Sequence, residues 1–259
     1  MKQGERRVFL IQRLLSERKD ASRLAVPAGE EAQETMLRSL MNIRPPRAID
    51  SGFLSVQDAY LQEAIARKGV TELSSLSPVA DGIYLWQGDI TTLRCDAIVN
   101  AANSGMTGCY VPCHRCIDNC IHTYAGIQLR LACARLMDEQ GHEEETGRAK
   151  ITPAYNLPCR YVIHTVGPIV GRRVTQADRD LLASCYRSCL ALAEQKGLRS
   201  IAFCCISTGE FHFPNDQAAA IALQTVRDYR RENASRIEVI FNVFKDIDHE
   251  IYRKLLAKH

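Results

Sequence analysis

The strongest constraint on the fold is an alternation of short apolar runs with helical patterns, which begins at Gly82 and continues almost to the end of the chain. The apolar runs are Ile83–Trp86, Ala97–Val99, Tyr161–Val166, Ser200–Ile206 and Ile237–Phe244. The segments with helical spacing lie between them, at Asp118–Met137, Gln176–Gln195 and Gln217–Glu232. Strands that alternate with helices in this way are typical of an α/β sheet covered on both faces. We therefore expect an α/β fold that binds ligands beyond the carboxyl ends of its strands.

The first part of the chain has a different pattern, with helical spacing and almost no strand signal. The helical segments are Val8–Leu15, Glu31–Met41 and Val56–Ile65. Pro27 and Pro45 punctuate these segments, and proline is a strong breaker of regular structure. We expect a helical N-terminal extension over residues 1–80 and one α/β domain over residues 81–259.

Composition and charge disfavour several classes of protein. The chain is 46% hydrophobic and 24% charged, which is ordinary for a soluble globular protein. Its net charge is only +3 and it has no basic stripe, which argues against nucleic-acid binding. The apolar run Val8–Leu10 is too short for a secretory signal, and no apolar segment is long enough to span a membrane. We therefore expect a cytoplasmic protein that acts on neither nucleic acid nor membranes.

The chain has eleven cysteines, and one group of them has the density of a site. Cys109, Cys113, His114 and Cys116 fall within eight positions, and thiolate and imidazole are ligands that zinc prefers. A closed structural zinc site commonly takes two ligand pairs, but the sequence has no second Cys-x-x-Cys pair. A three-ligand site with an open position is therefore favoured. A structural zinc, or reactive thiols without a metal, stay open as alternatives.

Three loops at strand ends carry polar residues. Asp89 follows a glycine turn and could accept a hydrogen bond from an adenine, although Asp is also a common helix cap. Asn100 and Asn103 flank two alanines that allow close approach of a ligand, although Asn is also a common turn former. The backbone of Ser207–Phe211 suits phosphate oxygens, although an ordinary strand-to-helix turn explains the same residues. Each loop alone is a weak signal.

Taken together, these loops and two further segments resemble a macrodomain in their order and spacing. The segments that carry the resemblance are Gly88–Thr91, Val99–Asn103, Ile117–Gly126, His164–Pro168 and Ile206–Gly209. The resemblance covers roughly residues 80–259. It implies a central mixed β-sheet flanked by helices, in a protein that binds ADP-ribose.

The first phosphate loop departs from the common macrodomain pattern. Hydrolase macrodomains of the MacroD type usually have a run of glycines there, whereas this chain has Gly108–Cys116. The chain therefore resembles the zinc-dependent macrodomain subfamily, which shares a helical N-terminal extension and a segment like Met41–Pro46. This resemblance implies a Zn²⁺ cofactor whose ligands are Cys109, His114 and Cys116. Cys113 remains the rival of Cys109, and a sirtuin-type ADP-ribosyltransferase is implied as a functionally linked protein.

The same resemblance assigns roles to the loop residues. Asp89 and Ile90 would hold the adenine end of the ligand. Asn103 would orient the distal ribose, and Asp118 would position a water or a ribose hydroxyl. The diphosphate would lie against the backbone amides of Ser207, Thr208, Gly209, Glu210 and Phe211.

The implied activity is zinc-dependent removal of mono-ADP-ribose from modified proteins, with Asp or Glu as the acceptor. Two other functions would use the same pocket. One is a non-catalytic reader that only binds ADP-ribose, and the other is a deacetylase of O-acetyl-ADP-ribose. We expect His122 and His164 to be buried packing or hydrogen-bonding residues rather than ligands or proton shuttles.

Overall fold

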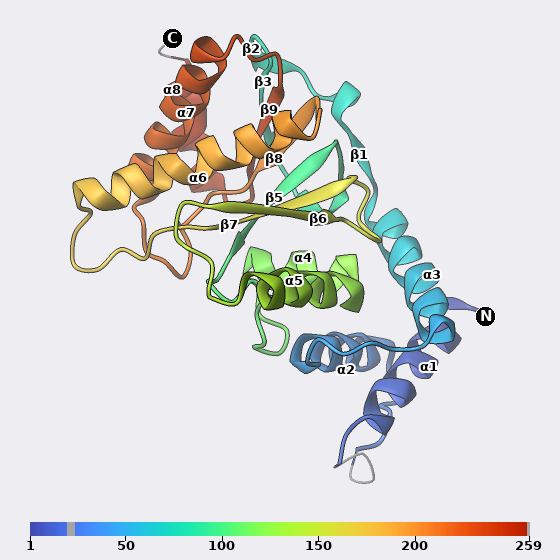
Figure 1. Cartoon of the computed structure of the whole chain (residues 1–259). Helices are drawn as coiled ribbons and strands as arrows, with labels where there is room; N and C mark the ends of the chain where they lie inside the picture. Colours follow the sequence, from blue (N-terminus) through green and yellow to red (C-terminus); the bar gives the residue numbers. More distant parts are fainter. Residues whose placement is uncertain (20–23, 258–259) are drawn as a thin grey trace.

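A mixed β-sheet organises the larger part of the chain (Figure 1). The computed structural model describes residues 1–19 and 24–257, and within them this sheet has seven strands in the order β2-β3-β9-β8-β5-β7-β6. The strands are β2 (Pro78–Ala80), β3 (Ile83–Gln87), β5 (Ala97–Ala102), β6 (Ala149–Pro153), β7 (Tyr161–Val166), β8 (Ser200–Phe203) and β9 (Glu238–Val243). The five inner strands are parallel, and the edge strands β2 and β6 are antiparallel to their neighbours. The expected mixed sheet is confirmed.

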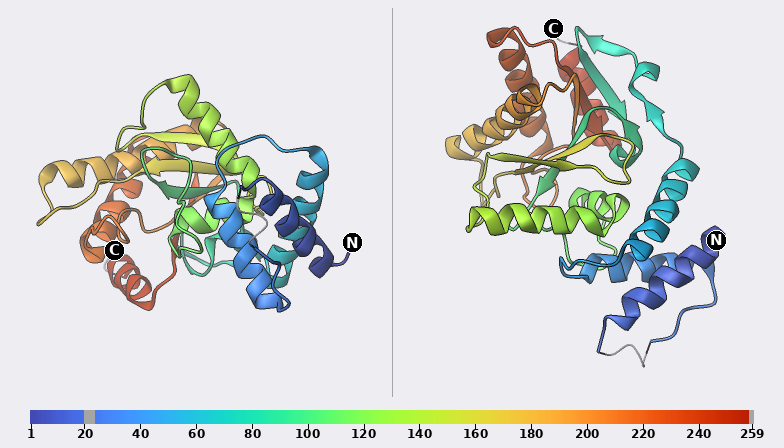
Figure 2. Two further views of the ribbon diagram at one scale, coloured as in Figure 1. Left: turned by 90° about the horizontal axis from the view of Figure 1, so that it is seen from below. Right: turned by 45° about the vertical axis from the view of Figure 1, so that its right-hand side comes forward.

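Helices cover both faces of this sheet (Figures 1 and 2). One face is covered by α4 (Ile117–Ala125) and α5 (Ile127–Gln140). The other face is covered by α6 (Gln176–Gln195), α7 (Asn215–Glu232) and α8 (Asp246–Leu256). Because the inner strands are covered on both sides, residues such as Ile98, Val99 and Val239 are completely buried. This burial explains why these strands are continuous apolar runs in the sequence.

The N-terminal helices pack together beside α4 and α5 (Figures 1 and 2). They are α1 (Gln3–Ser16), α2 (Glu30–Ile43) and α3 (Ser51–Lys68). Their apolar faces form a second core, which includes Leu10, Ile11, Leu37, Leu40, Phe53 and Leu61. Ile127, the first residue of α5, also belongs to this core. The expected helical extension is therefore present, and it is joined to the helical layer on one face of the sheet.

Residues 71–80, which the pattern placed in the N-terminal extension, pair with the α/β part of the chain. β1 (Thr71–Glu72) is parallel to β4 (Leu93–Arg94), and β2 pairs with β3. Two short 3₁₀ helices, Leu73–Ser75 and Ile90–Thr92, lie next to these strands. No helix of the described residues combines the length and the apolar character that a membrane span requires.

The structure corrects two expected elements, and besides the short strands β1, β2 and β4 it adds a strand and a helix. The helix expected over residues 118–137 is two helices, because Gly126 adopts φ +97° between them, and a Cβ there would lie 2.7 Å from Gln57 Nε2. The strand expected over residues 200–206 ends at Phe203, where the chain turns into the loop that contains Ser207. Edge strand β6 and helix α8 were not expected. β6 reads Ala-Lys-Ile-Thr-Pro and has no apolar run that would indicate a buried strand.

Candidate functional site

The loops named from the sequence meet beyond the carboxyl ends of the parallel strands, as expected for an α/β sheet. Asn103 follows the last residue of β5, and Asp118 lies in the first turn of α4. The loop that contains Ser207 follows β8, which is hydrogen-bonded to β5. The site is therefore built from segments that are far apart in the sequence.

Asp118 is the buried centre of this site, with 4% of its surface exposed. Asn100 Nδ2 donates to its Oδ1 at 2.8 Å, and Asn103 Nδ2 lies 3.4 Å from its Oδ2. Burial raises the pKa of Asp118 to about 6, although the hydrogen bond from Asn100 and the charge of Arg130 oppose this rise. A carboxyl group that titrates close to neutral pH is suited to proton transfer.

Two histidines lie behind Asp118. His122 Nε2 is 3.5 Å from Asp118 Oδ1, and burial lowers the pKa of His122 well below its usual value. His164 accepts or donates hydrogen bonds with Asn100 (3.1 Å) and Thr152 (2.9 Å), and burial lowers its pKa to about 3. Both imidazoles are therefore neutral core residues at physiological pH. Their nitrogens and Cys133 Sγ lie within 4.8 Å of one another, which makes a second, fully buried group of possible ligands.

Cys109, His114 and Cys116 converge on one another, and each of them is partly exposed. Their ligand atoms all lie within 4.8 Å of one another, and Cys109 Sγ is 3.7 Å from His114 Nδ1. In tetrahedral zinc sites, Zn–S distances of about 2.3 Å and Zn–N distances of about 2.0 Å place neighbouring ligand atoms roughly 3.5 Å apart. Two thiols and one imidazole at this spacing are a donor set that fits Zn²⁺.

Cys113 is turned away from these three residues. Its Sγ is 3.2 Å from Ser39 Oγ, and its backbone N–H donates to Asn42 Oδ1 at 2.9 Å, so it faces α2. Its φ of +53° produces this reversal within the loop. The structure thus brings Cys109, and not Cys113, to His114 and Cys116.

Gly108 and Cys116 fix the two ends of the loop that carries the candidate ligands, residues 108–116, which we call the metal loop after this candidate role. Gly108 has φ +85°, and a Cβ there would lie 2.8 Å from His122 Cγ, so the chain can follow this path only with glycine. Cys116 is the N-cap of α4, where its Sγ accepts a hydrogen bond from Asn119 N at 3.4 Å. Burial, together with the neighbouring Cys109, raises the pKa of the Cys116 thiol to about 12.

Residues 207–211, the expected contact for the diphosphate, face the metal loop, and we call them the second phosphate loop. His114 Nε2 lies 3.6 Å from Glu210 Oε1. Within the described part of the chain, the backbone N–H groups of Gly209, Glu210 and Phe211 have no protein acceptor, whereas that of Thr208 donates to Cys205 O at 3.4 Å. Successive free N–H groups form a concavity that suits phosphate oxygens.

Ser207 is the tightly packed start of the second phosphate loop. It has φ +65° and is 5% exposed. A Cβ at Gly167 would overlap Ser207 Oγ, so the loops after β7 and β8 pack against each other directly. This contact fixes the position from which the free amides of the loop extend.

Asp89 and Ile90 are more constrained than the sequence indicated. Asp89 Oδ1 accepts from Thr91 N at 3.0 Å, and Lys68 Nζ is 2.8 Å from Oδ2. Burial would raise the pKa of Asp89, but these hydrogen bonds lower it below its usual value. Asp89 therefore does cap a helical turn, while its side chain stays 38% exposed. Ile90 is 2% exposed, so only its backbone can reach a ligand.

Phe244 is an exposed residue beside the loop of Asp89, and the sequence pattern did not single it out. It follows Val243 of β9, which pairs with Gln87 of β3, and it is therefore near Asp89. Gln87 Nε2 donates to Phe244 O at 3.4 Å, and Phe244 is 75% exposed. An exposed aromatic ring at the carboxyl end of a strand is placed to stack on a base. Its position at the end of an apolar run made it look like part of the strand.

Comparisons with known proteins show which family and which relatives the chain resembles. A family model described as "Macro domain" matches residues 99–222. The chain is 57% identical over 261 residues to a protein-ADP-ribose hydrolase of Treponema medium, and the matched region covers 99% of this chain and 100% of that protein. It is 50% identical over 248 residues to a protein-ADP-ribose hydrolase of Staphylococcus aureus (strain MRSA252), covering 95% and 93%.

Solved structures share the fold. The Trypanosoma brucei macrodomain in complex with ADP-ribose superposes with a TM-score of 0.66 at 32% sequence identity, covering 84% of this chain and 94% of that one.

Proposed function

The chain belongs to the macro domain family, and from this premise we propose that it is a zinc-dependent hydrolase that removes mono-ADP-ribose from modified proteins. The observation that carries the proposal is the convergence of Cys109, His114 and Cys116 close to Asp118. A reader that only binds ADP-ribose would need neither this donor set nor a buried carboxyl group with a raised pKa. Similarity over nearly the full chain to two proteins named protein-ADP-ribose hydrolase supports the hydrolase part of the proposal.

The chain offers a contact for each part of ADP-ribose. We place the adenine against Phe244, near the Asp89 carboxylate and the Ile90 backbone. The diphosphate would lie on the free amides that begin at Gly209. Asn103 is exposed beside Asp118, where its amide can orient the distal ribose. The scissile bond would then lie between Asp118 and the metal loop.

The residues around the distal ribose would perform the hydrolysis. Asp118 would accept a hydrogen bond from the attacking water, or from a ribose hydroxyl, and take up its proton as the bond forms. Asn100 holds one carboxylate oxygen of Asp118 and Asn103 lies near the other, so its orientation is fixed. When bound, Zn²⁺ would supply a Lewis acid that polarises the ester oxygen. Water adds across the ester, and the products are free ADP-ribose and the free carboxylate of the target protein.

We also propose Asp or Glu as the acceptor on the target protein. A carboxylate is a stable leaving group, which suits a site that offers one basic carboxylate and a metal. The hydrolase has a substrate only where a transferase has made one, and we propose that a sirtuin-type ADP-ribosyltransferase in the cytoplasm is this linked enzyme.

Incubation with a protein that carries Glu-linked mono-ADP-ribose tests the function. We expect release of free ADP-ribose, measured by chromatography, together with loss of the label from the protein. Retention of the modified protein without release would indicate a reader, and cleavage of O-acetyl-ADP-ribose alone would indicate a deacetylase. Cys116→Ala should lose both zinc and turnover, whereas Cys113→Ala, in the same loop but turned towards α2, should keep both. A Cys116→Ala variant that keeps its zinc and its activity would refute the mechanism.

A further inference from the structure

The metal loop rests on the N-terminal helices as well as on the α/β domain. Arg38 of α2 donates from Nη2 to His114 O at 2.8 Å and to Asn119 Oδ1 at 2.8 Å. Asn42, four residues later on α2 and 1% exposed, accepts from Cys113 N at 2.9 Å. Residues four apart share a helix face, so α2 presents one polar face to this loop. The loop that carries the candidate ligands is therefore held in part by residues outside the α/β domain.

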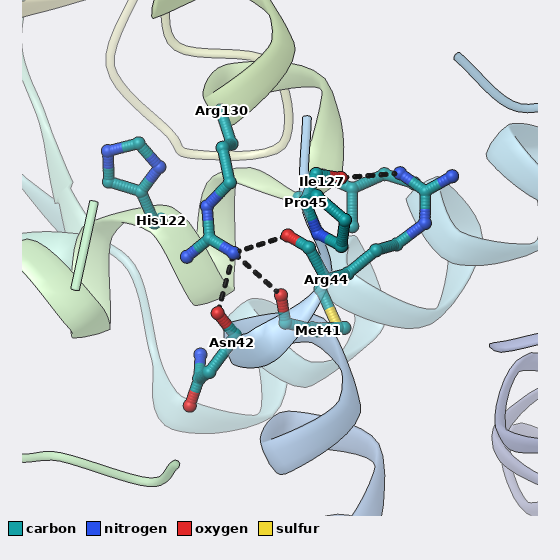
Figure 3. Close-up of a pocket in the computed structure, with 8 residues that line it drawn as sticks. Met41, Asn42, Arg44, Pro45, His122, Ile127 and Arg130 are labelled. Atoms are coloured by element: carbon teal, nitrogen blue, oxygen red, sulfur yellow. Dashed lines mark hydrogen bonds between the residues drawn. The ribbon is translucent and has the colours of Figure 1, made fainter. Parts of the chain in front are cut away.

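Arg130 of α5 joins the end of α2 to the rest of the protein (Figure 3). Arg130 is 4% exposed and lies beside a small pocket between α2, α4 and α5. Nη1 donates to Asn42 O at 2.6 Å and to Arg44 O at 2.7 Å, and it also reaches Met41 O at 3.3 Å. These are the last carbonyl groups of α2, where a cation is favourable because the helix dipole places negative charge there.

The other side of the same guanidinium holds the start of the metal loop. Arg130 Nε donates to Thr107 O at 2.7 Å, and Nη2 donates to Cys109 O at 3.3 Å. The guanidinium carbon lies 4.1 Å from the centre of the Tyr110 ring, which adds a cation–π contact. One planar group thus fixes the distance between the end of α2 and the backbone of a candidate zinc ligand.

We propose that Arg130 is a positioning residue of the metal centre, and that with Arg38 and Asn42 of α2 it holds the metal loop in its ligand-binding conformation. The N-terminal extension is then part of the metal site. This inference rests on the zinc dependence proposed above. A loop that is ordered before it binds a metal does not lose conformational freedom on binding, so its affinity is higher. Loss of groups that orient metal ligands typically weakens metal affinity about 10- to 100-fold.

The test compares two buried arginines in the full-length protein. Arg130→Lys keeps the charge but loses the planar fork that contacts both α2 and the loop. Arg7→Lys is the matched control: Arg7 is also 4% exposed, and its Nη1 is 2.9 Å from Glu30, at the opposite end of α2. The zinc dissociation constant is measured by competition with a chromophoric chelator, 4-(2-pyridylazo)resorcinol. Thermal unfolding of the metal-free proteins and ADP-ribose affinity are measured in parallel.

We expect Arg130→Lys to weaken zinc binding about 10- to 100-fold while ADP-ribose affinity is largely kept. Arg7→Lys should lower the unfolding temperature without changing the zinc dissociation constant. Asn42→Ala and Arg38→Ala should weaken zinc binding in the same direction, and they decide the question if Arg130→Lys does not fold.

Wild-type zinc affinity in the variants of Arg130, Asn42 and Arg38 would overturn the proposal. An equal loss of zinc affinity in Arg7→Lys and Arg130→Lys would overturn it as well, because the effect would then come from a general loosening of the helices. Either result would leave the proposed hydrolase function standing if the wild-type protein binds zinc and releases ADP-ribose. A wild-type protein that binds no zinc would overturn both.

Discussion

Gly108→Ala is expected to dislodge the metal loop, and its cost can be worked out from two contributions. An L-residue in the left-handed region costs about 1–2 kcal/mol, and Gly108 has φ +85°. The new Cβ would also lie 2.8 Å from His122 Cγ and 3.0 Å from His122 Nδ1. His122 is buried, with 4% of its surface exposed, and cannot move freely, so this overpacking adds about 1–3 kcal/mol. If the backbone keeps its conformation, the two contributions together lower the free energy of unfolding by roughly 2–5 kcal/mol. If the loop shifts instead, the free energy of unfolding falls less, but the candidate ligands separate.

Gly141→Ala is the matched control, because Gly141 has φ +76° but nothing lies within 4 Å of its Cβ position. Urea unfolding of both metal-free variants measures the free energy of unfolding, and chelator competition measures zinc affinity. We expect Gly108→Ala to lose about 1–3 kcal/mol more than Gly141→Ala, or to lose zinc affinity where Gly141→Ala does not. Equal unfolding free energies together with equal zinc affinities would show that the loop does not press on His122, and the reasoning would be wrong.

Three further predictions concern the metal, the adenine site and the buried histidine. Removal of zinc with a chelator should abolish the release of ADP-ribose, while ADP-ribose binding, measured by calorimetry, should remain. Added Zn²⁺ should restore turnover. Activity that persists after complete loss of zinc would show that the metal has a structural role. Phe244→Ala should weaken ADP-ribose binding about 5- to 150-fold, because base–aromatic stacking contributes about 1–3 kcal/mol, with little change in thermal stability; unchanged affinity would remove Phe244 from the adenine site. His164 has its pKa lowered to about 3, so its contribution to stability is complete above the ordinary value of 6.5 and is lost as the pH falls from there towards 3. The raised pKa of Asp118 affects stability in the opposite sense, so the wild type is compared with His164→Gln, in which Asp118 is still present. Between pH 7 and pH 5, the free energy of unfolding measured in urea should fall by about 2 kcal/mol more in the wild type than in His164→Gln. Equal losses in the two proteins would contradict a neutral buried imidazole.

The elements predicted well are those whose burial leaves a local trace in the sequence. β7 and α6 have the residue bounds that their patterns indicated, because a strand covered on both faces must be apolar and a helix must repeat its apolar face every turn. The break at Gly126 left no such trace. It depends on the close approach of Gln57, which is far away in the sequence and brings α3 against the start of α5. Edge strand β6 was missed for a related reason, since a strand at an edge does not need an apolar run.

The same distinction applies to the site. The order of the loops is a property of the sequence, so the segments containing Asn103, Asp118 and Ser207 could be named in advance. The geometric choice between Cys109 and Cys113 could not be made in this way. It depends on a left-handed turn at Cys113 and on contacts with Ser39 and other residues of α2, more than seventy positions earlier. Phe244 was missed because an exposed aromatic residue next to a buried strand reads as one more strand residue.

The metal loop needs outside support because it has little regular structure of its own. Between Gly108 and Cys116 it forms a turn bond from His114 N to Val111 O, and several of its carbonyl groups are bound by side chains of the surrounding helices. Asn119 of α4 donates to Val111 O, Arg130 of α5 to Cys109 O, and Arg38 of α2 to His114 O. With its carbonyl groups directed outwards to these donors, the loop can direct two thiols and an imidazole towards one another. A run of glycines in this place could bind phosphate through its own amides, whereas a ligand-bearing loop must have its side chains oriented, and the helices around it provide that orientation.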